Sequence, residues 1–105
     1  MGTEVFEKIP LLRNNIILQE IDANHGDKET VVVLPSKNQI KVVNEVGSFI
    51  LHLIDGKRTV AEIVEEVQRQ YASPAEQIEK DVVTFLGQLA EKEIIDFIPG
   101  YTERK

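Results

Sequence analysis

Side chains that could do chemistry are few in this chain, and they are widely separated. The only histidines are His25 and His52, and the 105 residues include no cysteine. Thiolate nucleophiles, disulfides, zinc–thiolate sites and cysteine-ligated Fe–S clusters are therefore excluded. We expect His52 to be a partly solvated surface residue rather than a metal ligand. No glycine-rich phosphate loop or nucleophile elbow is present, so we expect no enzyme activity, no cofactor and no metal site.

Backbone hydrogen bonding at the edge of a sheet is the chemistry that remains. We expect Gln39–Val43 to be the last strand of a three-stranded meander. A terminal strand leaves a row of N–H and C=O groups unpaired, and an extended peptide can pair with them as an additional strand. The sequence therefore favours a peptide-binding module.

Three extended segments make up the predicted meander. Ile16–Ile21 suits the first strand, and the β-branched run Thr30–Leu34 suits a strand buried by neighbours on both sides. A polar loop at 22–29 and a turn at Pro35–Asn38 connect these segments to Gln39–Val43. If consecutive strands pair, the second strand is central and the third lies at an edge.

Alternation along the third strand assigns its side chains to two faces. We predict that Ile40 and Val42 face the core, whereas Gln39, Lys41 and Val43 share the opposite face. Lys41 either discourages edge-to-edge aggregation or forms a salt bridge with an acidic ligand. Val43 is apolar on the face expected to be solvated, which makes it a candidate for contact with a guest peptide.

Three amphipathic helices follow the meander. Asn44 can cap the first helix, and Gly56 fits the left-handed position after its end. Thr59–Glu62 and Ser73–Glu76 both match capping boxes, so we expect the second and third helices to begin there. The third helix should run over about residues 74–93.

The third helix has a wider apolar surface than core packing requires. Its predicted core seam consists of Ile78, Val82, Phe85 and Leu89. Val83, Leu86 and Ala90 widen the apolar arc to roughly 160°, whereas a core-facing stripe needs about 100°. This flank either packs against the sheet or lines a groove beside the edge strand, and both hold if the groove lies at the seam between helix and sheet.

Two glycines fall inside the predicted helices. Gly47 and Gly87 each cost up to about 1 kcal/mol against alanine in a helix. Close helix packing is the simple explanation, and Gly87 could also admit a ligand or partner.

Composition limits the number of domains and the kinds of partner. A chain of 105 residues suits one small domain, which we place at 16–98 between an N-terminal arm at 1–15 and a tail at 99–105. A net charge of −6 disfavours nucleic acid and anionic membrane surfaces, because both bind clustered Lys and Arg. No signal peptide or bilayer-spanning apolar run is visible, so we expect a cytoplasmic location.

The sequence resembles the PqqD family, within the wider group of RiPP recognition elements. The likeness covers residues 16–95 and rests on Asn44–Ile50, Ile54–Val60, Glu62–Val64, Asp81–Val82, Phe85–Leu86, Leu89 and Ile94–Ile95. This resemblance implies an α+β fold in which a three-stranded antiparallel sheet is followed by a three-helix bundle, similar to a winged helix-turn-helix.

Family membership would also imply a function. Domains of this kind are not catalytic. They bind the leader segment of a ribosomally synthesised precursor peptide between the third strand and the third helix, and present it to a modifying enzyme such as a radical SAM protein. The first known member serves pyrroloquinoline quinone biosynthesis, and the arm before residue 16 departs from that pattern. Carried over by position, the peptide-binding residues are Gln39, Ile40, Lys41, Val42, Val43, Val83, Leu86 and Ala90.

Two other functions stay open on the sequence alone. A winged helix-turn-helix protein often binds DNA through its second helix, although that segment here carries Glu62, Glu65, Glu66 and only Arg69 near its end. The other alternative is a general protein-interaction domain, present as a monomer or as an edge-paired homodimer.

Overall fold

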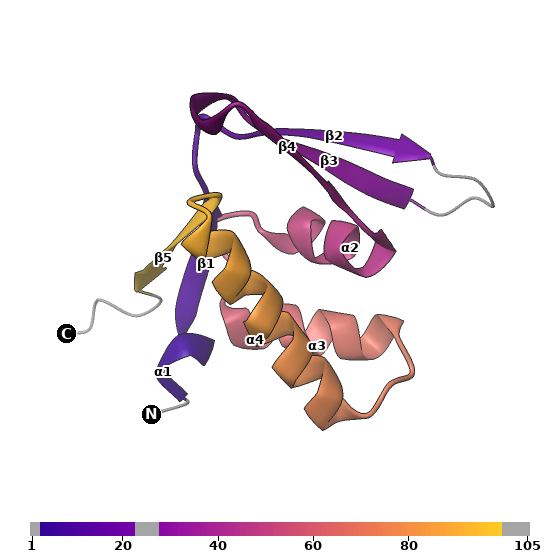
Figure 1. Cartoon of the computed structure of the whole chain (residues 1–105). Helices are drawn as coiled ribbons and strands as arrows, with labels where there is room; N and C mark the ends of the chain where they lie inside the picture. Colours follow the sequence, from indigo (N-terminus) through magenta and orange to yellow (C-terminus); the bar gives the residue numbers. More distant parts are fainter. Residues whose placement is uncertain (1–2, 23–27, 100–105) are drawn as a thin grey trace.

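In the computed structural model of this chain, the described residues are 3–22 and 28–99. A three-stranded sheet forms one layer, α2 lies directly beneath it, and α3 and α4 lie farther below (Figure 1). A second pair of strands, β1 and β5, stands to one side. In chain order the elements are α1 (Thr3–Phe6), β1 (Lys8–Leu12), β2 (Ile17–Asp22), β3 (Lys28–Leu34), a 3-10 turn (Pro35–Lys37), β4 (Gln39–Val43), α2 (Glu45–Leu53), α3 (Val60–Gln70), α4 (Ala75–Glu91) and β5 (Ile95–Pro99).

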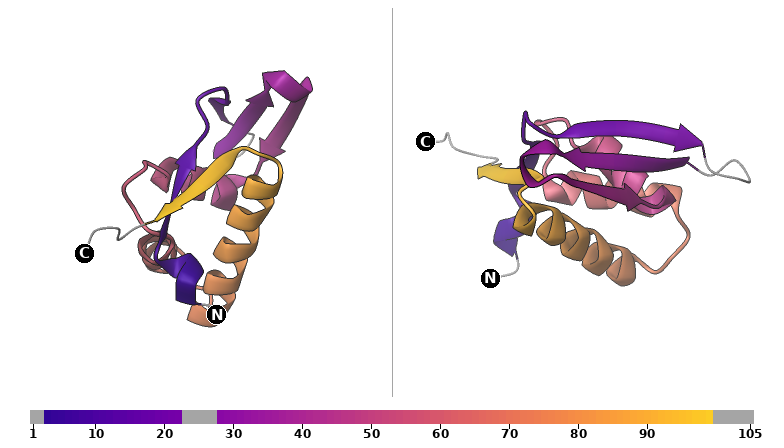
Figure 2. Two further views of the ribbon diagram at one scale, coloured as in Figure 1. Left: turned by 90° about the vertical axis from the view of Figure 1, so that its left-hand side faces the viewer. Right: turned by 45° about the horizontal axis from the view of Figure 1, so that its top comes forward.

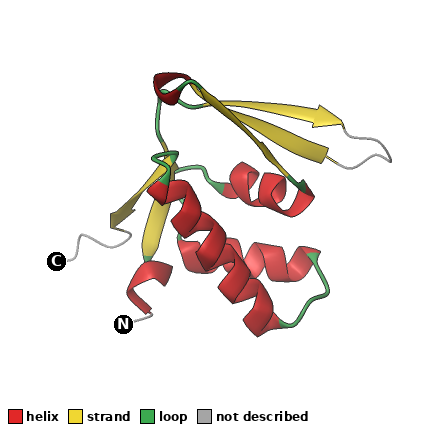
Figure 3. Ribbon diagram, viewed as in Figure 1, coloured by secondary structure: helices red, strands yellow, loops and turns green. Residues whose placement is uncertain are grey.

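The predicted α+β class, the three-stranded antiparallel sheet and the three helices are confirmed (Figure 3). The strand order is β2-β3-β4, so β3 is central and β4 is an edge strand, as the sequence indicates. The bounds of β4 are also as predicted. Its start follows Asn38, whose positive φ of 55° closes the turn after Leu34, and Asn44 caps the helix that comes next by accepting a hydrogen bond from the Gly47 N–H.

The predicted faces of β4 are wrong. Ile40 and Val42 are 70% and 59% exposed, whereas Val43 is 4% exposed and belongs to the core. The two-residue alternation holds, but the apolar pair faces outward. Packing of α2 sets this phase, because Gly47 brings that helix against Val43.

An apolar outer face results on the side of the sheet opposite the helices. Ile17 and Ile21 on β2 are 53% and 38% exposed, and they share this face with Ile40 and Val42. The ladder register connects the two edges through β3, since Val33 pairs with both Ile17 and Ile40. In Figure 1 all the helices lie on the other face of the sheet.

The N-terminal arm pairs with the end of the domain. Strands β1 and β5 form an antiparallel ladder over five residue pairs. An Arg13 N–H bond to the Ile94 carbonyl oxygen at 3.0 Å and an Arg13–Asp96 ion pair at 3.1 Å extend the contact. Figure 2 shows the two strands side by side, and they form a sheet separate from the one that contains β4. The described part of the arm, residues 3–15, therefore leaves the free edge of β4 uncovered.

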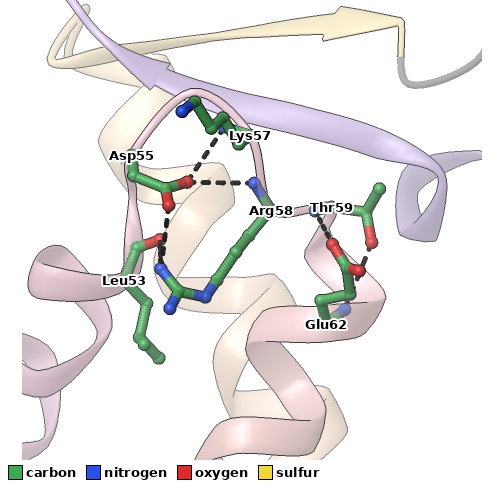
Figure 4. A network of polar contacts seen from close by, with 6 residues as sticks. All are labelled: Leu53, Asp55, Lys57, Arg58, Thr59 and Glu62. Carbon is green, nitrogen blue, oxygen red and sulfur yellow. Dashed lines mark hydrogen bonds and ion pairs between the residues drawn. The ribbon is translucent and has the colours of Figure 1, made fainter.

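The connection from α2 to α3 is a compact polar network (Figure 4). The Asp55 carboxylate accepts hydrogen bonds from the backbone N–H groups of Lys57 and Arg58 at 2.9 and 3.0 Å, and it also pairs with the Arg58 guanidinium at 3.0 Å. These bonds, led by the Arg58 N–H, hold the pKa of Asp55 below its ordinary value. Gly56 is left-handed as predicted, with φ of 78°, although it lies two residues after the C-cap Ile54.

One of the two predicted capping boxes forms. Thr59 accepts a hydrogen bond from the Glu62 N–H, and the Glu62 carboxylate accepts one from the Thr59 N–H (Figure 4). The second prediction, at Ser73–Glu76, is wrong. Pro74 is the N-cap of α4 and has an extended ψ of 142°, so the helix starts at Ala75 and no side chain caps it. Ser73 stands one residue too early in the chain to reach the free N–H groups.

Candidate functional site

The free edge of β4 is the first part of the candidate site. One side of this strand pairs with β3, and no strand of the described residues pairs with the other side. In an antiparallel ladder, alternate residues turn their N–H and C=O groups outward. The right-hand view of Figure 2 places β4 on the side of the sheet nearest α4. An extended guest chain on this edge would therefore lie alongside α4.

One flank of α4 faces this edge. Asp81, Phe85 and Lys92 all line pockets that they share with β4 or with the residues just after it. At 100° per residue these three side chains fall within about 40° of one another on the helix surface. The region between this flank and β4 is called the trench below. Pockets are present at both of its ends.

At the Val43 end of the trench lies a mainly apolar pocket of about 340 Å³. Its wall combines Val46 and Ile50 of α2, Tyr71 after α3, and Asp81 and Phe85 of α4. We call this the apolar pocket. Tyr71 is held in place by an edge-to-face contact with Phe49, with ring centroids 5.8 Å apart. Burial and the nearby Glu45 carboxylate raise the pKa of Tyr71 above its ordinary value.

At the Gln39 end of the trench lies a second pocket, of about 360 Å³. It is lined by Leu34, Gln39, Ile40, Lys41 and Lys92, and we call it the lysine pocket. Within the described parts of the chain, neither Lys41 nor Lys92 forms an ion pair. The trench therefore has unpaired positive charge at one end and an apolar pocket at the other.

Gly47 permits the close packing that shapes the trench. A Cβ atom on Gly47 would overlap the Cγ1 of Val43 and would lie 3.1 Å from the Cζ of Phe85. The close-packing explanation predicted for Gly47 is thus confirmed. Gly87 differs, because apart from its two chain neighbours and the adjacent backbone of its own helix, no heavy atom of the described residues lies within 4 Å of the position where its Cβ would stand.

The structure places the sequence-predicted helix residues away from the trench. Leu86 is 1% exposed and lies in the core, in the position that the sequence pattern assigned to Phe85. Val83 and Ala90 are partly buried against the core. Val83 is about 160° around the helix from Phe85, and Ala90 is about 160° around it from Lys92. Both therefore point away from the trench. All five strand residues, Gln39–Val43, do lie at the free edge.

Sequence reasoning missed Asp81, Phe85 and Lys92 as trench residues. Phe85 and Leu86 are neighbours that stand at comparable angles on either side of the buried seam, so the apolar pattern alone cannot tell which of them is buried. Lys92 lies just after the last helical residue of α4. Its position in the sequence could have indicated this, because Lys92 stands about two helical turns after Phe85 and therefore on the same side of the helix.

His52 takes no part in the trench. His25 lies outside the described residues. The His52 side chain is 58% exposed and pairs with Glu20 at 3.4 Å, which confirms the predicted surface position. In the described part of the chain, no three His, Cys, Asp or Glu side chains gather closely enough to hold a metal ion. The described helices also lack the length and apolar content needed to cross a membrane.

Two solved structures are similar in fold to this chain. One, described as TbiB1 in complex with the TbiA(beta) leader peptide, aligns with a TM-score of 0.71 and 25% identity, over 89% of this chain and 99% of that one. The other, a lasso peptide synthetase B1 complexed with the leader peptide, aligns with a TM-score of 0.65 over 83% and 96% of the two chains. At 14% identity, the second likeness shows a shared fold.

Sequence relatives agree with the predicted resemblance. The chain is 34% identical over 71 residues to a PqqA binding protein of Gluconobacter oxydans (strain 621H), covering 68% of this chain and 74% of that protein. It is 39% identical over 67 residues to a PqqA binding protein of Pseudomonas syringae pv. syringae (strain B728a), covering 64% and 69%. The family model for coenzyme PQQ synthesis protein D (PqqD) matches residues 29–95. Because this match spans more than half of the 105 residues, the chain belongs to the PqqD family.

Proposed function

We propose that this chain is a non-catalytic module that binds the leader segment of a ribosomally synthesised precursor peptide as an added strand on β4. The free edge of β4 beside the trench is the observation that carries the proposal. The relatives named for PqqA binding and the similar structures solved with leader peptides support the same class of ligand. Presentation of the bound peptide to a modifying enzyme, such as a radical SAM protein, belongs to this proposal.

A guest strand would use both faces of the sheet. Its alternate side chains would enter the trench, and the others would lie on the outer face beside Ile40 and Val42. Exposed apolar residues on a free edge are an aggregation hazard in an isolated protein. A guest strand would remove that hazard by pairing with the edge and covering these two side chains, which are 70% and 59% exposed.

The expected affinity is moderate. Each ladder hydrogen bond contributes about 0.5–1.5 kcal/mol net, and each cross-strand side-chain pair about 0.2–1 kcal/mol. A large apolar side chain buried in the apolar pocket adds roughly 1.5–3 kcal/mol. Ordering the flexible peptide offsets about 2–5 kcal/mol or more of this gain.

The oligomeric state depends on the same free edge of β4. We predict a monomer or a homodimer paired through β4, and light scattering distinguishes the two. A β4-paired dimer would occupy the peptide site, so added peptide should dissociate it.

DNA binding has no specific observation in its favour. The winged helix-turn-helix description would make α3 the recognition helix, and α3 carries Glu62, Glu65 and Glu66. Its arginine, Arg69, already pairs with Glu66 at 2.8 Å. Phosphate contacts require clustered positive charge, which this helix lacks.

A matched pair of variants tests the proposal. Val42 and Ile17 both lie on the outer face, are 59% and 53% exposed, and stand on opposite edges of the sheet. With a synthetic PqqA peptide of Gluconobacter oxydans, calorimetry should show about threefold to tenfold weaker binding for Val42→Lys, because an apolar cross-strand pair of up to about 1 kcal/mol is lost and a charge is placed beside the guest. Ile17→Lys should bind as the unchanged chain does. Equal affinities for the two variants would argue against binding at β4.

A further inference from the structure

The two pockets of the trench differ in charge and stand at opposite ends of β4. We infer that the trench selects guest peptides by two side chains: a large apolar one in the apolar pocket and, four residues later in the guest, an acidic one in the lysine pocket. This inference rests on the proposed function, because it assumes that the guest pairs with β4.

The apolar pocket suits an aromatic or large aliphatic side chain. A dry cavity of about 150 Å³ is enough to hold benzene, and this pocket measures about 340 Å³. Val46 is 39% exposed although it is a wall residue, so a guest side chain would cover apolar surface that water now contacts. Asp81 also contributes to the wall and accepts a hydrogen bond from Gln77 at 2.8 Å. Its carboxylate would repel an acidic guest residue at this end.

The lysine pocket suits a carboxylate. Lys41 and Lys92 approach it from β4 and from the end of α4, and neither is neutralised by an ion pair in the described residues. Lys37 is nearby in the chain but is already paired with Glu93 at 3.3 Å. Two unpaired like charges facing one hollow repel each other, and a guest carboxylate placed between them relieves that repulsion.

Strand geometry fixes the spacing and the direction of the two guest residues. The sheet is antiparallel throughout. A guest that continues this order would place its N-terminal part at the Val43 end and its C-terminal part at the Gln39 end. Side chains at positions i, i+2 and i+4 of the guest share the trench face, and four residues span about 14 Å at 3.4 Å each. Four residue steps also separate Gln39 from Val43, the two ends of β4. An odd spacing would turn one of the two side chains to the outer face.

Selection from a random peptide library tests the inference and does not require the natural precursor. The full chain would select from displayed random peptides of about twelve residues. We expect enrichment of a large apolar residue followed four positions later by Asp or Glu. For one selected peptide made synthetically, replacing the acid by Lys should weaken binding to the unchanged chain by about tenfold in fluorescence anisotropy.

Charge reversal in the protein supplies the decisive comparison. The double variant Lys41→Glu and Lys92→Glu should reverse the preference, so that the Lys form of the peptide binds better than the acidic form. The double variant Lys57→Glu and Lys80→Glu changes the net charge equally at exposed positions that line neither pocket. It should keep the acidic preference. An unchanged preference in the Lys41/Lys92 variant, or a reversal in the control variant as well, would overturn the inference.

NMR separates failure of this inference from failure of the proposed function. Selected peptides that shift the amide signals of Gln39–Val43 but show no acidic residue at i+4 would overturn the two-residue selection and leave strand addition intact. Selected peptides that leave these amide signals unshifted would overturn both.

Discussion

Gly47 joins the stability of the fold to the shape of the trench. Replacing it with alanine would push a methyl group into the Val43 side chain and toward the Phe85 ring, whose Cζ and Cε1 atoms lie 3.1 and 3.3 Å from the added Cβ. Val43 is only 4% exposed and cannot turn away into solvent. Overpacking of this kind typically costs about 1–3 kcal/mol. Alanine regains about 0.5–1 kcal/mol of backbone entropy in a helix, so Gly47→Ala should lose about 0–2.5 kcal/mol of stability.

Gly87→Ala is the matched control. Gly87 also lies in a helix, and the space around it is open. The same entropic gain acts there without a clash, so this variant should gain about 0.5–1 kcal/mol. The difference in the free energy of unfolding between the two variants therefore isolates the clash, at about 1–3 kcal/mol. For a domain near this size, that difference corresponds to a separation of at least about 4 °C in Tm.

Urea unfolding followed by circular dichroism would measure both variants, and calorimetry with the PqqA peptide would measure binding. Because Val43 and Phe85 must shift to accept the methyl group, Gly47→Ala should also weaken peptide binding, whereas Gly87→Ala should leave it unchanged. Should Gly47→Ala be as stable as Gly87→Ala, the close approach of α2 to β4 would be wrong.

Two further predictions concern the polar contacts that hold the domain. The Thr30 hydroxyl donates to the Ser48 hydroxyl at 2.7 Å in a buried position. Ser48→Ala should therefore cost about 1–3 kcal/mol in urea unfolding, and adding Thr30→Val should cost less than the sum of the two single variants; strict additivity would show that the two hydroxyls are not coupled. The pKa of Asp55 is lowered from 3.8 in the folded chain, so its ionised form stabilises the fold above pH 3.8, and this stabilisation is lost as the pH falls through the lower folded-state pKa. Asp55→Asn should accordingly reduce stability at neutral pH, and this deficit should shrink as the pH falls through the folded-state pKa; a deficit that did not vary with pH would refute this.

Sequence patterns predicted β4 well because both of its ends have local signals. The turn at Pro35–Asn38 precedes it, and Asn44 caps the next helix. The phase of its alternation has no such signal. Apolar residues occupy both faces, at Ile40 and Val42 on one side and at Val43 on the other, so only the docking of α2 decides which face is buried.

Contacts between segments that are far apart in the sequence account for the other differences between the predicted and the observed structure. The pairing of β1 with β5 joins residues from the two ends of the chain, and no local pattern in either segment specifies its partner. On α4, the apolar residues Val83 and Ala90 directed the sequence interpretation to the flank opposite the trench. The flank that does face β4 is marked instead by Asp81, Phe85 and Lys92, two charges and one aromatic ring, which apolar periodicity does not reveal.

Interchain NOEs between the isotopically labelled chain and an unlabelled PqqA peptide would show directly whether the guest becomes a strand. Strand addition predicts cross-strand NOEs from the peptide to alternate residues of Gln39–Val43, together with slower amide exchange at those same residues. A bound peptide with NOEs only to β2 or α3, and with amide exchange on β4 unchanged, would contradict it.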